Sequence, residues 1–141
     1  MYRIGLRAAA LAVALGVGLA AGTAVPAHAA TGAAPAASGC ELTVENPKVT
    51  GFFTRKVTTR GKVMCSGIAF EIRLWVWLTQ LGVGETEKFY NDHLVDRLEG
   101  GASRSCQVGW YQARARGYWE IGPIKDQQLV YSDYLYVDTC D

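Results

Sequence analysis

The chain has 141 residues, with 14 Lys and Arg against 13 Asp and Glu, so its formal net charge is +1. This near-neutral balance provides no strong positive field for steering nucleic acid, and we expect no nucleic-acid partner. The chain contains 4 cysteines, an even number that favours two disulfides in an extracytoplasmic protein.

The N-terminus has the three regions of a secretory signal peptide. Arg3 and Arg7 supply positive charge, an Ala-, Leu-, Val- and Gly-rich stretch follows over residues 8–21, and the Ala-His-Ala of residues 27–29 offers the small side chains that signal peptidase accepts. The apolar stretch is shorter and less hydrophobic than the roughly 20 residues of a membrane span, so we expect no membrane anchor. The sequence therefore predicts a secreted, extracellular protein with residues 1–29 as its signal peptide.

The mature chain divides into a tail and one domain. Residues 30–39 carry no charge and no large apolar side chain, which predicts a flexible N-terminal tail, either a spacer or a docking arm that orders on a partner. Residues 40–141 hold all four cysteines and are rich in Val, Tyr, Trp and Thr, the residues of strands. About 100 residues make a single domain whose small core benefits from crosslinks.

From Cys40 onwards the pattern indicates short strands separated by Gly, Pro and Asn signals. Strands are expected over residues 41–45, 53–65, 68–79, 107–116 and 129–139. We therefore predict an all-β fold, an antiparallel β-sandwich.

The clearest strand covers residues 68–79, where apolar side chains alternate with others. We expect one face to lie on the core, formed by Ile68, Phe70, Ile72, Leu74, Val76 and Leu78. The opposite face carries Glu71, Arg73, Trp75 and Trp77.

Residues 85–98 are ambiguous. Tyr90, Leu94 and Leu98 have helical spacing, but the neighbouring segments are strands, and we favour a strand. In either case we expect Gly100-Gly101 to end the segment.

The last third of the chain carries a loose motif. It reads Cys106-x-x-Gly109-Trp110-Tyr111-x-Ala113-x-Ala115-x-Gly117, followed by Tyr131-Ser132 and Cys140. This pattern resembles small secreted actinobacterial proteins of immunoglobulin-like type.

The resemblance implies an immunoglobulin-like sandwich. Tyr111 is similar to the tyrosine of the tyrosine corner, although Ala113 stands where the inter-sheet cysteine would be expected two residues later. In size, export and architecture the chain is also similar to the small tailed adaptor subunits of actinobacterial umbrella toxin particles, from which no residue role is transferred.

Four cysteines allow three disulfide pairings, and their spacing does not decide among them. Because consecutive antiparallel strands are usually neighbours, we predict the pairs Cys40–Cys65 and Cys106–Cys140. A four-thiolate zinc site is the alternative, but there is no C-x-x-C pair and His93 is the single histidine after residue 29. We expect no metal and no cofactor.

The sequence favours no catalytic site. There is no G-x-S-x-G motif, and His93 has no evident orienting partner. Glu71 lies on a face with tryptophans, which can stack on sugars, but no second carboxylate can be placed beside it from the sequence.

The face with Arg73, Trp75 and Trp77 is the candidate binding site, because exposed Trp and Arg mark interfaces. The alternative is that a loop or residues 85–98 cover the two indoles. For the remaining aromatic residues we favour core packing; these are Trp110, Trp119, Tyr131, Tyr134 and Tyr136.

The function expected is that of a non-enzymatic module that binds an extracellular protein, as an adaptor or subunit of a complex such as an antibacterial toxin, in an oligomeric state left open. A secreted protease inhibitor is the second hypothesis, with residues 100–105 as its reactive loop. A carbohydrate-binding module or small glycoside hydrolase is the third.

The signal peptide gives the first prediction. Cleavage after residue 29 should produce a secreted protein that begins at Ala30. Intact-mass measurement of protein from the culture medium checks this, and Met1 retained on extracellular protein contradicts it.

Overall fold

The computed structural model describes residues 39–140. The predicted signal peptide, residues 1–29, and all of the predicted tail up to residue 38 lie outside the described residues. The described part consists of strands and connecting turns, and it contains no helix able to cross a membrane.

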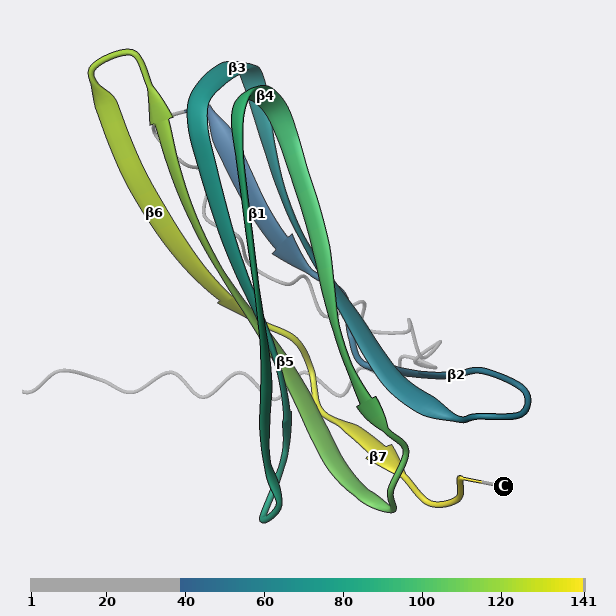
Figure 1. The fold of residues 1–141 in the computed structure, drawn as a ribbon. Helices are drawn as coiled ribbons and strands as arrows, with labels where there is room; N and C mark the ends of the chain where they lie inside the picture. Colours follow the sequence, from purple (N-terminus) through teal and green to yellow (C-terminus); the bar gives the residue numbers. More distant parts are fainter. Residues whose placement is uncertain (1–38, 141) are drawn as a thin grey trace, which may run out of the picture.

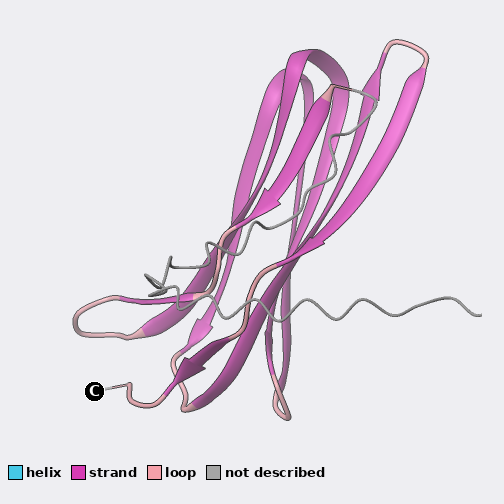
Figure 2. Cartoon of the chain, turned by 180° about the vertical axis from the view of Figure 1, so that it is seen from behind, coloured by secondary structure: helices cyan, strands magenta, loops and turns pink. Residues whose placement is uncertain are grey.

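Seven strands form one antiparallel sheet (Figure 1). They are β1 (Cys40–Val44), β2 (Lys48–Thr50), β3 (Lys56–Gln80), β4 (Gly84–Ser105), β5 (Gly109–Ile121), β6 (Ile124–Tyr131) and β7 (Leu135–Val137). The strand order is β1-β3-β5-β6, while β2 and β4 also pair with β3 and β7 pairs with β5. The predicted all-β, antiparallel fold is confirmed. The predicted immunoglobulin-like sandwich is not confirmed, because the strands belong to a single curled sheet, seen from behind in Figure 2.

The curl comes from the long β3–β4 hairpin, which folds back on itself at the top of Figure 1. The two strands are in register up to the pair Met64–Arg97 and again from the pair Ala69–Val95, so residues 65–68 of β3 oppose only Asp96 of β4. The first half of β3 carries β1 and β2, and the second half carries β5. This bulge therefore turns the two halves towards each other, with the core between them.

Glycines allow the two halves to approach closely. A Cβ atom on Gly61 would lie 2.8 Å from Cγ2 of Val76 and 3.1 Å from Cβ of Ala115. From the other side, a Cβ atom on Gly117 would lie 2.9 Å from Cγ2 of Val63. Since real Cβ atoms do not approach this closely, both positions need glycine.

Residues 85–98 form a strand, as favoured, but Gly100-Gly101 does not end it. β4 continues through both glycines to Ser105 and stays paired with β3. The Tyr90 ring occupies the space that a Cβ atom of Gly100 would fill, and its hydroxyl donates to the Gly101 carbonyl at 2.6 Å. Gly100 and Gly101 were expected from the sequence to end the strand. In the structure Gly100 instead leaves room for the Tyr90 ring.

The core prediction for residues 68–79 is half right. Ile72, Leu74, Val76 and Leu78 are fully buried, but Ile68 and Phe70 are 68% and 60% exposed. Ala69 is buried in the core, and Glu71 is also buried, but on the face of Arg73, which binds its carboxylate. Ile68 and Phe70 lie at the bulge, where the pairing of β3 with β4 shifts between Met64 and Ala69.

Both predicted disulfides are present, and no described cysteine is free, so the zinc alternative is excluded. Cys40 and Cys65 are directly opposite each other in the β1–β3 ladder, with Cα atoms 3.9 Å apart. Cys106 and Cys140 have Cα atoms 5.7 Å apart, and the strands next to them, β5 after Cys106 and β7 before Cys140, pair as expected.

The predicted closing strand over residues 129–139 is two strands. Ser132 interrupts it, with its amide donating to the Ala113 carbonyl and its hydroxyl accepting from the Ala113 amide at 2.8 Å. Both pieces, β6 and β7, still pair with β5.

The aromatic residues are less buried than expected. Trp119 and Tyr111 are in the core, and the Tyr111 hydroxyl donates to the Gln107 carbonyl four residues upstream at 2.9 Å, the hydrogen bond of a tyrosine corner. The prediction of core packing is wrong for the others, which are about half exposed: Trp110, Tyr131, Tyr134 and Tyr136.

The two halves of the folded sheet approach so closely at Gly61 that adding one methyl group there should lower the free energy of unfolding. Gly61→Ala should destabilise the domain by about 1–3 kcal/mol, because the new carbon overlaps Val76 in a closed core. Gly67→Ala is the matched control, since nothing lies within 4 Å of its Cβ position. Chemical denaturation of both variants checks this, and equal stability of the two would contradict the fold.

Candidate binding face

Four strands present one continuous surface that points away from the core, which we call the outer face. Alternation along each strand sends every second side chain to this side, and the register aligns them across β4, β3, β5 and β6. Its central members are Phe89 on β4, Arg73, Trp75 and Trp77 on β3, Arg114, Arg116 and Tyr118 on β5, and Leu129 and Tyr131 on β6.

The register produces rows in which aromatic and basic residues adjoin. Trp75 is paired with Phe89 on one side and Arg116 on the other, and Arg116 is paired with Leu129. In the next row Trp77 is paired with Arg114. Directly opposite residues in antiparallel strands have Cβ atoms close enough for such side chains to pack together.

Each of the three arginines of this face lies over an aromatic ring. The Arg114 guanidinium carbon is 4.6 Å from the Trp77 ring centroid, and that of Arg116 is 5.7 Å from the Trp75 centroid. The pattern reverses one row further on, where Arg73 of β3 lies 5.3 Å from the Tyr118 ring of β5. These three cation–π contacts fix the guanidinium groups and the rings in one arrangement.

Trp75 and Trp77 are half-buried, and neither of the alternatives expected from the sequence describes them. Residues 85–98 do not lie over the indoles but beside them, as part of β4, which places the Phe89 ring 4.9 Å from the Trp75 ring. The cover comes from neighbouring side chains in the same sheet. The candidate residues Arg73, Trp75 and Trp77 therefore do share one solvent-facing surface.

Polar contacts hold the guanidinium groups in place. Arg114 donates to a Glu85 carboxylate oxygen at 3.1 Å, and Glu85 also accepts from the Thr79 hydroxyl at 3.0 Å. Arg116 donates to the Gln127 side-chain carbonyl, an uncharged acceptor. Among the described residues Arg116 forms no ion pair, so its charge at the centre of the face has no carboxylate partner.

One end of the outer face is a charged network. Glu71 is directly opposite Glu120, so the structure supplies the second carboxylate that sequence alone could not place. Arg73 binds Glu71 with two hydrogen bonds of 2.8 and 2.9 Å, while Tyr118 and Lys125 both donate to Glu120.

The network keeps both carboxyls ionised. The hydrogen bonds from Arg73 lower the pKa of Glu71, and those from Tyr118 and Lys125 lower the pKa of Glu120. Glycoside hydrolysis needs one carboxylic acid that remains protonated near neutral pH, which requires a raised pKa. Neither Glu71 nor Glu120 has the raised pKa that such a proton donor requires.

Other features of the described residues offer little chemistry. A shallow hollow of about 440 Å³ lies away from the outer face, lined by Lys48, Thr50, Thr58, Thr59, Arg60, Gly101, Ala102 and Ser103. No group of three or more His, Cys, Asp or Glu side chains within residues 39–140 could hold a metal ion. Residues 100–105 belong to β4 and Ala102 is buried, so the reactive loop predicted there for a protease inhibitor is wrong.

Sequence reasoning found the β3 part of this face and missed the rest. Arg114 and Arg116 showed the alternation of a strand, but nothing in the sequence indicated that β5 lies next to β3 in this register. Phe89 was missed because residues 85–98 had no assigned face.

Comparison with known proteins adds no relative. No family model, no curated protein and no solved structure matches the chain. The candidate site consequently rests on its own geometry.

The charged network predicts a pH dependence of stability. Because the pKa values of Glu71 and Glu120 are lower in the folded protein, the unfolded chain takes up more protons as the pH falls. Their contribution is fully present above the ordinary glutamate pKa of about 4.3 and is lost as the pH falls below it.

Glu71→Gln should therefore flatten the decline of the melting temperature below about pH 5. Glu87→Gln, at an exposed position on β4, is the control and should keep the wild-type decline. Thermal melts from neutral to acid pH measure this; an unchanged acid decline in Glu71→Gln would show that the network does not stabilise the fold.

Proposed function

We propose that this protein is a secreted, non-enzymatic module that binds another protein outside the cell through its outer face, as an adaptor or subunit of a larger complex. The single observation that carries the proposal is the cluster of Trp75, Trp77 and Arg116. It is a solvent-facing group of ordered Trp and Arg side chains in which the central guanidinium has no carboxylate partner.

The composition of the cluster supports a protein partner. Trp, Tyr and Arg dominate the energetic centres of protein interfaces, and the outer face adds Tyr118 and Tyr131 to the cluster. The cation–π contacts already hold these side chains, so little rotamer entropy would be lost on binding.

The same contacts favour protein over polysaccharide. A sugar-binding platform presents free aromatic ring faces on which pyranose rings stack. Here guanidinium groups lie over the rings of Trp75, Trp77 and Tyr118. The face instead presents fixed cations beside apolar surface, and we expect the partner to contribute an acidic side chain opposite Arg116.

Two finer interpretations belong to this proposal. The tyrosine-corner hydrogen bond of Tyr111 supports kinship with secreted immunoglobulin-like sandwiches. Extracellular location is compatible with the two disulfides, which persist in oxidising environments.

Charge reversal at the centre of the face tests the proposal. With the oxidised protein as bait for secreted proteins of its native host, Arg116→Glu should weaken capture of the partner at least about thirtyfold, as for a hot spot of about 2 kcal/mol. Affinity is measured by titrating the purified partner.

Arg97→Glu is the matched control. Arg97 is an exposed arginine in the part of β4 that pairs with the first half of β3, away from the outer face. It should bind like the wild type. Equal weakening in both variants would show a general charge effect and contradict the proposed site. Capture of proteases, or retention on polysaccharide without a captured protein, would support the inhibitor or the carbohydrate-binding hypothesis instead.

A further inference from the structure

Apolar side chains gather on the loops at the end of the molecule opposite the bend. The β2–β3 loop carries Phe52 and Phe53, the β3–β4 turn carries Leu81 and Val83, and the β4–β5 loop carries Val108; all five are exposed. Figures 1 and 2 both show these three loops in the lower half of the molecule. Folding the β3–β4 hairpin in two is what brings the start and the finish of β3 to the same end.

The β2–β3 loop is the most prominent of the three. Phe52 and Phe53 are 88% and 96% exposed, and their rings contact each other edge to face at 5.1 Å. Gly51, with a φ of 93°, closes the loop tightly, since a Cβ atom there would lie 2.3 Å from the Thr54 carbonyl oxygen. Two large rings thus stand in solvent on a compact turn.

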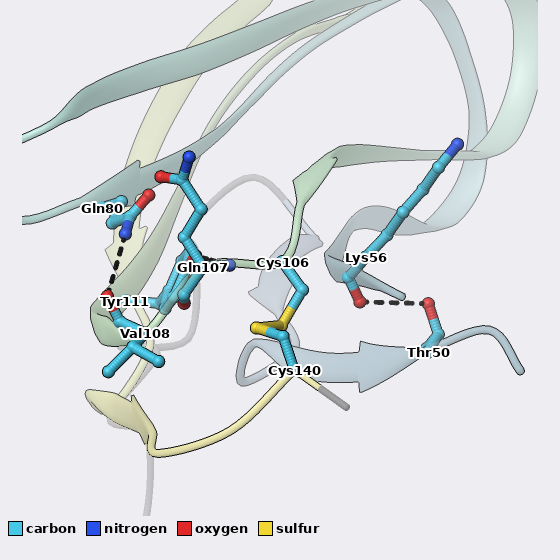
Figure 3. Close-up of a disulfide and its surroundings, with 8 residues drawn as sticks. All are labelled: Thr50, Lys56, Gln80, Cys106, Gln107, Val108, Tyr111 and Cys140. Carbon is cyan, nitrogen blue, oxygen red and sulfur yellow. Dashed lines mark hydrogen bonds between the residues drawn. A yellow bond between two sulfur atoms is a disulfide. The ribbon is translucent and has the colours of Figure 1, made fainter. Parts of the chain in front are cut away.

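The loops are fixed to one another rather than free. The Cys106 amide donates to the Arg55 carbonyl at 3.1 Å, which joins the β4–β5 loop to the β2–β3 loop, and the Leu81 amide donates to the Trp110 carbonyl at 3.0 Å. Figure 3 shows the Cys106–Cys140 disulfide between the Thr50–Lys56 hydrogen bond of one loop and the Gln80–Val108 hydrogen bond of the others. The bases of the three loops are therefore held together at this end of the sheet.

Positive charge accompanies this surface. Arg55 and Lys56 follow the two phenylalanines directly, and neither forms an ion pair within residues 39–140. The three connections, residues 51–55, 81–83 and 106–108, contain no Asp or Glu, and the acid of this end is the exposed Asp138 on the segment that Cys140 joins to Cys106. Trp110 and Tyr136, which are half exposed, contact each other with tilted rings whose centroids are 4.9 Å apart.

We propose that this loop end docks onto an anionic lipid surface. Phenylalanine, leucine and valine at the tips would enter the boundary between headgroups and acyl chains, and the Trp110–Tyr136 pair would lie at headgroup level, where such rings are enriched. Arg55 and Lys56 would face the anionic headgroups.

A lipid surface fits better than a pocket in a protein partner. Exposed apolar tips can enter a fluid layer without needing complementary pockets, and Arg55 and Lys56, which form no ion pair among the described residues, match a negatively charged surface. This inference is independent of the outer face, whose residues lie along the strands.

Sedimentation with vesicles tests the docking. The secreted, oxidised protein without residues 1–29 is mixed with vesicles of phosphatidylcholine alone or with added phosphatidylglycerol, and the bound fraction gives a partition coefficient. We expect binding to the anionic vesicles, at least about tenfold weaker in F52S/F53S, because each ring loses apolar burial. R55S/K56S should lose about tenfold on anionic vesicles and little on neutral ones.

Ile68→Ser/Leu94→Ser is the matched control, since both residues are exposed and apolar but lie at the bend. It should bind like the wild type, and so should Arg116→Glu, which separates this proposal from the protein-binding face. The wild type and all variants share the same N-terminal segment, so that segment cannot cause a difference in binding. Their melting temperatures show whether each variant is folded. Absence of wild-type binding, or equal losses in the loop and bend variants, would overturn the proposal; so would loss of a protein partner by F52S/F53S without vesicle binding.

Discussion

The length of the β3–β4 hairpin constrains everything else in this domain. β3 alone has 25 residues, which at about 3.3 Å per residue would extend to roughly 80 Å if it remained straight. A compact domain of about 100 residues has a radius of gyration near 13 Å, so a flat hairpin would leave its apolar side in water. Folding back at residues 65–68 buries that side against itself. The bend then requires the glycines at 61 and 117 and the opening that Tyr90 fills beside Gly100.

Alternation in the sequence could predict strands, but not where a strand changes face. The assignment is correct from Ile72 onwards, where regular pairing holds, and fails at Ile68 and Phe70, next to the bulge. A bend in a strand is usually announced by glycine with a left-handed φ. Here Gly67 lies in the bulge of β3 but does not have a positive φ, which belongs instead to Leu94 of β4, at 56°. The Cys40–Cys65 disulfide was predictable because the two cysteines lie on strands, β1 and β3, that are close in the sequence and pair antiparallel.

The candidate site was predictable only within one strand. Trp75 and Trp77 followed from the period of β3, whereas Arg114, Arg116 and Phe89 join them through pairing of residues far apart in the chain. This pairing also explains why the indoles are neither exposed nor covered by a loop. Because the guanidinium groups both pack on the rings and carry the charge, truncating a tryptophan would disturb stability and recognition together. Arg116, which is exposed, separates the two effects better.

The two proposed surfaces are geometrically compatible. The outer face runs along β4, β3, β5 and β6, while the apolar loops lie where those strands end or begin. A surface that contacts only strand ends leaves the sides of the sheet open, so docking on lipid would orient the outer face away from the bilayer plane. The Cys106–Cys140 disulfide lies among the loops and not on the outer face, and its cysteines are 34 positions apart in the sequence. Its loss should therefore loosen the loop end first, although closing a chain segment of this length contributes about 3–4 kcal/mol to the stability of the whole domain.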